Sequence, residues 1–212
     1  ECVNACNAVF AHGYTLNATY KGNYDSDDLA SNPEMIFFKD YKLDLFMHSL
    51  ISYTCSSSNQ HGITKDAFDS FLFLDGKPLA TTTLDKNDAA ELDAATGKAS
   101  IAKVLQTRDK RLAAIVDPYL GFKGRGYVRD FVPDAPNMTS VTGYTIGKYD
   151  DPAKYALINR DQNNKNYSDA PVFWLAPVYL AFAEAKAELG TISQADLNNT
   201  INKLQARAGL PD

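Results

Sequence analysis

Two stretches of this chain combine aromatic rings with hydrogen-bonding side chains. The first is the short segment that contains Tyr53, Asn59, Gln60 and His61. The second is the longer segment that contains Arg125, Tyr127, Tyr144 and Tyr149. Aromatic rings stack on the C–H face of a sugar, while amides, guanidinium groups and hydroxyls bond to its hydroxyl groups. We therefore predict that these eight residues bind a carbohydrate. The alternative is that each tyrosine is half-buried and each polar group is solvated.

Trp174 is the only tryptophan and has two possible roles. Its ring could be a sugar platform, or it could anchor a hydrophobic core between Phe173 and Leu175. The apolar neighbours favour the core.

Acidic and basic residues give no pattern typical of an enzyme. Asp109 and Arg111 lie two residues apart, and we interpret them as a structural ion pair at a helix end. Glycoside hydrolysis needs two carboxyl groups roughly 5–9.5 Å apart in a cleft, and no pair stands out among the acids. The chain has no GxSxG, HExxH or glycine-rich phosphate motif. We therefore do not expect an enzyme.

Cysteine and histidine likewise predict no metal site and no cofactor. These residues are Cys2, Cys6, Cys55, His12, His48 and His61. Their spacing lacks the paired CxxC of structural zinc sites, and the odd cysteine count is no disulfide framework. Buried, small apolar cysteines are the better interpretation.

The composition is that of a globular chain of 212 residues with 45% hydrophobic and 22% charged residues. We expect one domain over residues 1–212. The net charge of −5 argues against a nucleic-acid partner or an anionic membrane surface, because both need a basic field. No apolar stretch approaches the ~20 residues of a membrane-spanning helix.

The elements that must position these side chains are mostly helical. Residues 1–14 and 88–116 read as helices, the second interrupted at Gly97, and Met35 to Phe38 as a short strand. Residues 117–155 read as an irregular loop region with short strands near Tyr127–Phe131 and Tyr144–Tyr149.

The clearest local pattern is a helix hairpin over residues 177–208. Pro177 suits the first turn of a helix, Gly190 its end, and Ser193 with Asp196 the start of a second helix. Two apolar stripes follow helical spacing: Val178, Phe182, Ala185 and Leu189, then Leu197, Ile201, Leu204 and Ala208. Gly209 and Pro211 end the second helix.

The order of these blocks resembles the SusD/RagB family of outer-membrane glycan-binding lipoproteins of Bacteroidetes. The resemblance is carried by ASNPEMIFFKDY (30–41), TRDKRLAAIVDP (107–118), YLAFAEAKAELG (179–190), ADLNNTINKL (195–204) and RAGLP (207–211), with FDSFLFLDGKPL (68–79) as a weaker match. The chain departs from the family's usual residues at Lys110, Trp174, Pro177 and Gln205, where the family has Pro, Arg, Glu and Arg.

The resemblance implies a fold and a function. The fold would be mainly α, with tetratricopeptide-like helix hairpins packed against a loop-rich region containing a few short strands. The chain would be the C-terminal portion of a longer SusD-like protein. That protein would be lipid-anchored at the bacterial cell surface, with the lipid anchor as its only membrane contact. It would capture a polysaccharide or oligosaccharide and deliver it to a TonB-dependent SusC-like transporter. The alternatives are a helical-repeat scaffold that binds protein and no glycan and, less favoured, a glycoside hydrolase.

Overall fold

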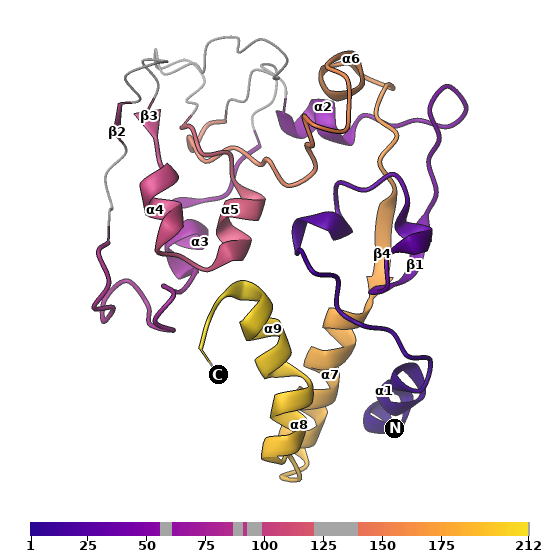
Figure 1. The fold of residues 1–212 in the computed structure, drawn as a ribbon, viewed down its shortest axis with the longest axis vertical. Helices are drawn as coiled ribbons and strands as arrows, with labels where there is room; N and C mark the ends of the chain where they lie inside the picture. Colours follow the sequence, from indigo (N-terminus) through magenta and orange to yellow (C-terminus); the bar gives the residue numbers. More distant parts are fainter. Residues whose placement is uncertain (56–60, 87–90, 93–98, 121–139, 212) are drawn as a thin grey trace.

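The C-terminal helices form a hairpin at one end of the molecule (Figure 1). The computed structural model describes residues 1–55, 61–86, 91–92, 99–120 and 140–211. Helix α7 spans Leu175–Glu188 and is followed by Gly190 at φ +66°. Ser193 then opens α8 (Gln194–Asn199) with a reciprocal capping box, because its Oγ accepts from the Asp196 N–H and its own N–H donates to the Asp196 carboxylate. The predicted hairpin is present, with its end signals at the expected residues.

The second helix of the hairpin is broken, which the periodic pattern did not predict. It divides into α8 and α9 (Ile201–Ala208) at Thr200, whose backbone leaves the helical region at φ −130° and ψ −84°. The buried Thr200 hydroxyl donates to the carbonyl of Asp196 at 2.7 Å. Such a bond from a threonine to the residue four positions earlier bends helices. Gly209 at φ +76° then ends α9, as predicted.

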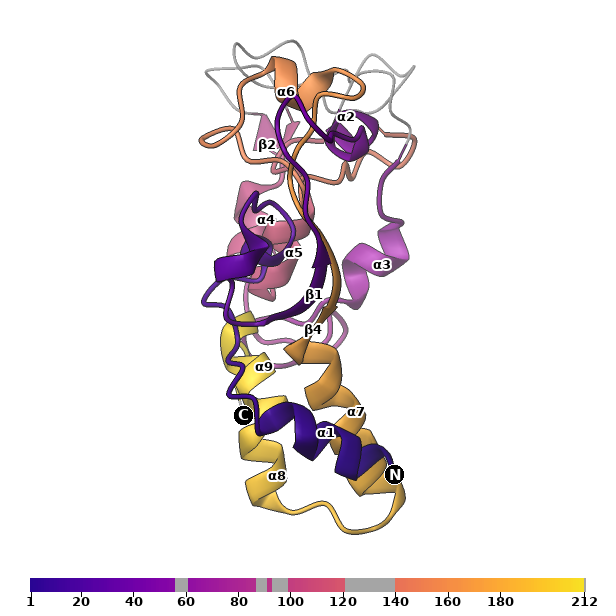
Figure 2. The ribbon, with the colours of Figure 1, turned by 90° about the vertical axis from the view of Figure 1, so that its right-hand side faces the viewer.

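Helix α1 (Cys2–Phe10) covers one side of α7 (Figure 2). The Phe10 ring lies edge-on to Tyr179 and Phe182, with centroids 5.5 and 5.3 Å apart. The buried core here comprises Cys6, Leu175, Val178, Tyr179 and Phe182. The predicted stripe on α7 is wrong at its last member, because Leu189 is 67% exposed. Leu189 caps the helix beyond its last turn, so it does not share the buried face.

A two-stranded antiparallel sheet runs up the middle of the molecule (Figure 2). Strand β1 (Met35–Lys39) pairs with β4 (Ala170–Trp174), and Phe37 lies opposite Phe173. Strand β4 continues directly into α7, so the sheet fixes where the hairpin starts. The expectation of a strand at Met35 to Phe38 is confirmed.

The region 88–116 is not helical from its beginning, so that expectation is wrong in part. Strands β2 (Glu91–Leu92) and β3 (Ala99–Ser100) pair with each other before α4 (Ala102–Gln106) and α5 (Lys110–Ile115). The break between the two helices falls after Gln106, where Asp109 becomes the N-cap of α5. A second core joins this region to α3 (Lys65–Ser70) through Phe68, Ile101, Val104, Leu112 and Val116.

The remaining described segments are short and irregular. Two 3-10 helices, η1 (Lys21–Asn23) and η2 (Leu29–Ser31), precede β1, while α2 (Leu50–Cys55) and α6 (Ile158–Asp161) lie at the end opposite the hairpin (Figure 1). The strand predicted at Tyr144–Tyr149 is reduced to isolated bridges from Thr145 to Gly62 and from Ile146 to Val116. The strand predicted near Tyr127–Phe131 lies outside the described residues.

The architecture is mainly helical with a small antiparallel sheet, as predicted. The tetratricopeptide-like repeat remains a prediction. None of the described helices has the length and apolar character needed to cross a membrane.

Candidate functional site

Of the eight residues predicted to bind carbohydrate, the structure describes Tyr53, His61, Tyr144 and Tyr149. Asn59, Gln60, Arg125 and Tyr127 lie outside the described residues. Among the other four, Tyr53 on α2 is 58% exposed and His61 is exposed, whereas Tyr144 and Tyr149 are half-buried.

His61 and Tyr144 lie on neighbouring backbone segments. The N–H of Ile63 donates to the carbonyl of Tyr144 at 3.1 Å, and Gly62 bridges Thr145. Tyr149 is directed elsewhere, because its ring packs edge-on to Tyr24 with the centroids 6.3 Å apart.

Tyr144 borders a cavity of about 370 Å³ between α3 and α4. Its ring stacks on Phe68 at a centroid distance of 4.5 Å, and burial raises the pKa of its hydroxyl. Asp69 and Lys65 also line this cavity and pair with each other. One ring face of Tyr144 is therefore already covered by Phe68.

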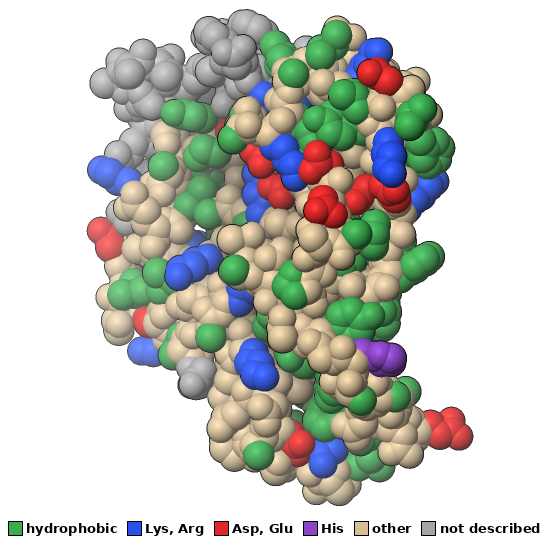
Figure 3. Space-filling model, turned by 45° about the vertical axis from the view of Figure 1, so that its right-hand side comes forward, with side chains coloured by type: hydrophobic (Ala, Val, Ile, Leu, Met, Phe, Trp, Pro, Cys, Tyr) green, Lys and Arg blue, Asp and Glu red, His purple; other side chains and the backbone are tan. Residues whose placement is uncertain are grey.

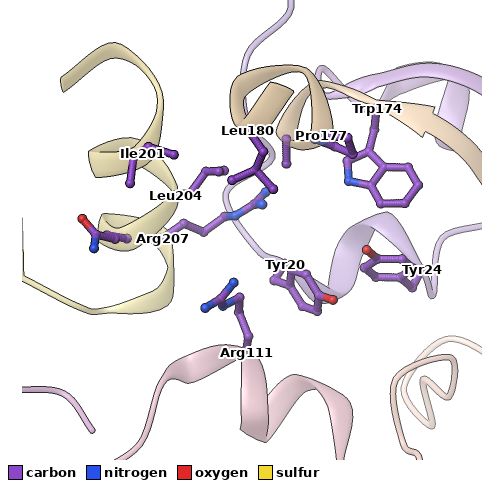
Figure 4. A pocket seen from close by; sticks show the side chains of 11 residues that line it. Tyr20, Tyr24, Arg111, Trp174, Pro177, Leu180, Ile201, Leu204 and Arg207 are labelled. Atoms are coloured by element: carbon purple, nitrogen blue, oxygen red, sulfur yellow. The ribbon is translucent and has the colours of Figure 1, made fainter. Parts of the chain in front are cut away.

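A second cavity, of about 330 Å³, brings together more rings and more donors (Figure 4). It lies between η1, α5, α9 and the junction of β4 with α7. The lining residues are Tyr20, Tyr24, Arg111, Trp174, Ala176, Pro177, Leu180, Ile201, Leu204, Gln205 and Arg207. We refer to it as the aromatic cavity.

Tyr20 and Tyr24 form one wall because they flank the 3-10 helix η1. Their ring centroids are 5.1 Å apart. Lys148 holds this pair from outside the cavity, with its Nζ 3.4 Å from the Tyr24 ring centroid and 3.2 Å from the Tyr20 hydroxyl oxygen. Burial, followed by the neighbouring Tyr20 hydroxyl, raises the pKa of Tyr24 far above its ordinary value. Tyr24 is therefore a neutral phenol throughout the physiological range.

Trp174 forms the adjacent wall at the end of β4. The indole meets Tyr24 edge-on, with centroids 5.8 Å apart and planes at 84°. The side chain is half-buried and also lines the cavity. Trp174 thus shows features of both predicted roles: it packs against the body of the protein and presents part of its ring to the cavity.

Two guanidinium groups enter the same cavity from different helices (Figure 4). Arg111 on α5 pairs with Asp109, whose carboxylate accepts from its Nε at 3.0 Å and its Nη2 at 2.5 Å. This confirms the predicted ion pair at the helix end. The hydrogen bonds to the Asp109 carboxylate are the main reason why the pKa of Arg111 is raised above its ordinary value.

Arg207 on α9 reaches the cavity beside a fully buried acid. Its Nη1 donates to Glu34 Oε2 at 2.5 Å, and the Asn17 N–H donates to the same oxygen at 2.9 Å. Within the described part of the chain, the buried Arg207 Nε and Glu34 Oε1 have no hydrogen-bond partner. Buried polar atoms normally have one, and these two atoms belong to the two partners of the same ion pair.

The lining of the aromatic cavity contains groups that can stack on a ligand and donate hydrogen bonds to it. In the part of the chain that the structure describes, this lining comprises rings, aliphatic side chains, two guanidiniums and one amide, and it includes no carboxyl group. Among the residues that the structure describes, no group of three or more His, Cys, Asp or Glu side chains is placed to hold a metal ion.

Sequence reasoning missed this cavity. Tyr20 and Tyr24 are four residues apart, but nothing in the sequence places them near Trp174 or Arg207. The interpretation of Asp109 and Arg111 as a structural ion pair is correct. It does not predict that the Arg111 side chain, which is 40% exposed, also lines a cavity.

The fold is mainly helical with a small antiparallel sheet, and comparisons with known proteins show its family. The SusD family model matches residues 7–212, and the chain belongs to this family. No curated protein matches the chain.

Two solved structures share the fold. A SusD-like carbohydrate binding protein from Bacteroides fragilis superposes with a TM-score of 0.68 at 23% identity, over 98% of this chain and 40% of that one. Another SusD-like protein from Bacteroides fragilis gives 0.62 at 19% identity, over 99% of this chain and 43% of that one. The chain therefore spans about two fifths of the length of these proteins.

Three of the four positions where the resemblance implies a departure from the family's usual residues line the aromatic cavity. They are Trp174, Pro177 and Gln205. The side chains at these positions are an indole, a pyrrolidine ring and an amide.

Proposed function

We propose that the chain binds a carbohydrate in the aromatic cavity. The observation that carries this proposal is the convergence of Tyr20, Tyr24 and Trp174 with the donors of Arg111, Arg207 and Gln205 around one opening. Rings stack on the apolar face of a sugar, and fixed donors select the orientation of its hydroxyls. Membership of the SusD family and the shared fold with a SusD-like carbohydrate binding protein support it.

The size of the cavity limits what it holds. About 330 Å³ is at the lower end of small-molecule sites, enough for one or two sugar rings of a longer chain. Few contacts are made with each ring, so we expect a dissociation constant of ~10 μM to mM.

In the wider proposal, the protein acts at the bacterial cell surface. A lipid-anchored SusD-like protein would capture a polysaccharide or oligosaccharide and pass it to a TonB-dependent SusC-like transporter without cleaving it. Family membership supports this role. A stable pair with the transporter would need a large interface, which copurification of the two proteins from membranes would reveal.

Glycan binding is tested by affinity gel electrophoresis against a panel of neutral and acidic polysaccharides. Trp174→Ala removes one wall and should weaken retardation about tenfold, whereas Trp174→Phe keeps a ring and should weaken it less. Because Trp174 is the only tryptophan, quenching or enhancement of its fluorescence reports ligand in the cavity directly.

The matched control is Tyr53→Ala, which removes an exposed ring from α2, a helix that does not line the cavity and lies at the end of the molecule away from the hairpin (Figure 1). If Tyr53→Ala or Tyr144→Ala abolishes retardation while Trp174→Ala leaves it unchanged, the ligand binds at the predicted loop residues instead. Failure to bind any glycan would favour the helical-repeat scaffold. Release of reducing sugar would favour a hydrolase.

A further inference from the structure

We infer that the aromatic cavity selects an acidic sugar, one whose ring carries a carboxylate. This inference rests on the proposed carbohydrate binding and names the class of ligand. Its starting point is that Arg111 and Arg207 come from separate helices and their side chains lie around the same opening (Figure 4). Within the described part of the chain, no acidic residue lines this cavity.

Both guanidinium groups retain unused donors. Arg111 engages Asp109 through Nε and Nη2, and no hydrogen bond from its Nη1 occurs within the described ranges. Arg207 engages Glu34 through Nη1, and its buried Nε is unpaired in the same part of the chain. The Arg207 side chain is only 9% exposed. A buried N–H without a partner is costly, and an acceptor on a ligand bound beside Arg207 would relieve that cost.

The charges around the cavity favour a negative ligand. Asp109 and Glu34 balance the two arginines, but their side chains are 1% and 0% exposed and are not part of the cavity wall. Lys148 adds a third positive charge behind the tyrosine wall and makes no ion pair with a described carboxylate. Among these five groups, two arginines and one lysine against two acids sum to a charge of +1.

A uronic acid fits this arrangement better than a neutral hexose. Its planar carboxylate offers two oxygens to a guanidinium edge, a geometry that arginine binds strongly. The ring that bears the carboxylate has the same apolar face as a neutral sugar, so it can stack on Trp174 or Tyr20 at the same time. A neutral sugar would offer the N–H groups of Arg207 only hydroxyl oxygens, which form weaker hydrogen bonds than a carboxylate does.

The test compares each acidic glycan with its own neutral derivative. Polygalacturonate, alginate and hyaluronan are run in affinity gels beside the same polymers after reduction of the carboxyl groups to alcohols. We expect at least one acidic polymer to retard the protein, and its reduced form to bind about tenfold more weakly. Binding should also weaken as salt is raised.

Variants locate the effect at Arg111. Arg111→Gln should weaken binding of the acidic polymer about tenfold, and Arg111→Lys should lie between it and the unmodified protein, because lysine keeps the charge but loses the planar fork. Lys42→Gln is the matched control, since it removes the same charge from an exposed side chain that does not line the cavity. Thermal melts confirm that the variants are folded.

The outcomes separate this inference from the proposed function. Equal binding of acidic and reduced polymers, or binding of neutral glycans alone, overturns the acidic-sugar inference while carbohydrate binding stands. No binding of any polymer overturns both. The salt dependence is measured on the unmodified protein, so the test does not depend on the stability of a variant.

Discussion

The buried pair of Glu34 and Arg207 gives the sharpest prediction on stability. It joins the segment before β1 to α9 and holds one side of the aromatic cavity. Glu34→Ala removes the acceptor of both the Arg207 Nη1 and the Asn17 N–H and leaves a guanidinium that is 9% exposed without its counter-ion. Breaking a buried pair in this way costs about 3–5 kcal/mol.

We expect the lower end of that range, about 3 kcal/mol, for a physical reason visible in the structure. Arg207 borders the aromatic cavity, so solvent can reach part of its guanidinium once Glu34 is gone. A loss of this size is still a large share of the ~5–15 kcal/mol that stabilises a typical domain.

The measurement is a double-mutant cycle by urea unfolding. Glu34→Ala, Arg207→Ala and the double variant are compared, and the second substitution should cost much less in the presence of the first. The coupling free energy should be about 2–3 kcal/mol, and the loss at Asn17 cancels because it occurs in both backgrounds. Equal m-values in all four proteins show that the comparison is valid.

The exposed pair of Asp40 and Lys42 is the control for the cycle. Its charged atoms are 3.4 Å apart, but the side chains are 56% and 65% exposed, so its coupling should stay below about 0.5 kcal/mol. A coupling of Glu34 to Arg207 no larger than this would refute the claim that the pair is a buried, structurally required contact.

Three further predictions concern local features. Burial raises the pKa of Asp25 to about 6, above its value of 3.8 in the unfolded chain, so the folded state binds the proton more tightly. The free energy of unfolding should therefore fall by about 1–2 kcal/mol as pH rises from about 4 to about 6. Urea unfolding of Asp25→Asn should lack this decline, and that of Asp40→Asn should keep it. Gly62→Ala would place a Cβ 2.6 Å from the Tyr144 carbonyl oxygen and should lower the free energy of unfolding by about 1–3 kcal/mol. Gly147→Ala is the control, because its new Cβ meets ordinary contacts from 3.5 Å and the loss of stability should be much smaller. Similar urea midpoints for the two variants would contradict this prediction. Ser193→Ala removes the capping box of α8 and should cost about 1 kcal/mol in the same assay, against at most about 0.5 kcal/mol for the neighbouring Gln194→Ala.

Local patterns predicted the hairpin because its signals act over a few residues. Gly190 and Gly209 adopt positive φ and Ser193 caps a helix through contacts with residues three or four positions away. The same reasoning failed at Thr200, where a buried side-chain hydroxyl competes with the helical pattern, and at 91–100, where two short strands pair before α4.

The family assignment also came from the sequence, since the order of its blocks survives without knowledge of their positions in space. The site did not. The described members of the predicted set lie in different environments. Tyr53 and His61 are exposed, whereas Tyr144 stacks on Phe68 and Tyr149 packs against Tyr24.

The sequence by itself determined the mainly helical architecture and the capped hairpin, because helix caps and apolar periodicity are properties of neighbouring residues. It also determined the family, because the order of the motifs is read along the chain. Only the tertiary structure decided which side chains meet. Tyr24, Arg111 and Trp174 lie far apart along the chain, and they surround one cavity because η1, α5 and the β4–α7 junction pack together. That packing depends on buried contacts between distant segments, such as Glu34 with Arg207, which no local pattern encodes.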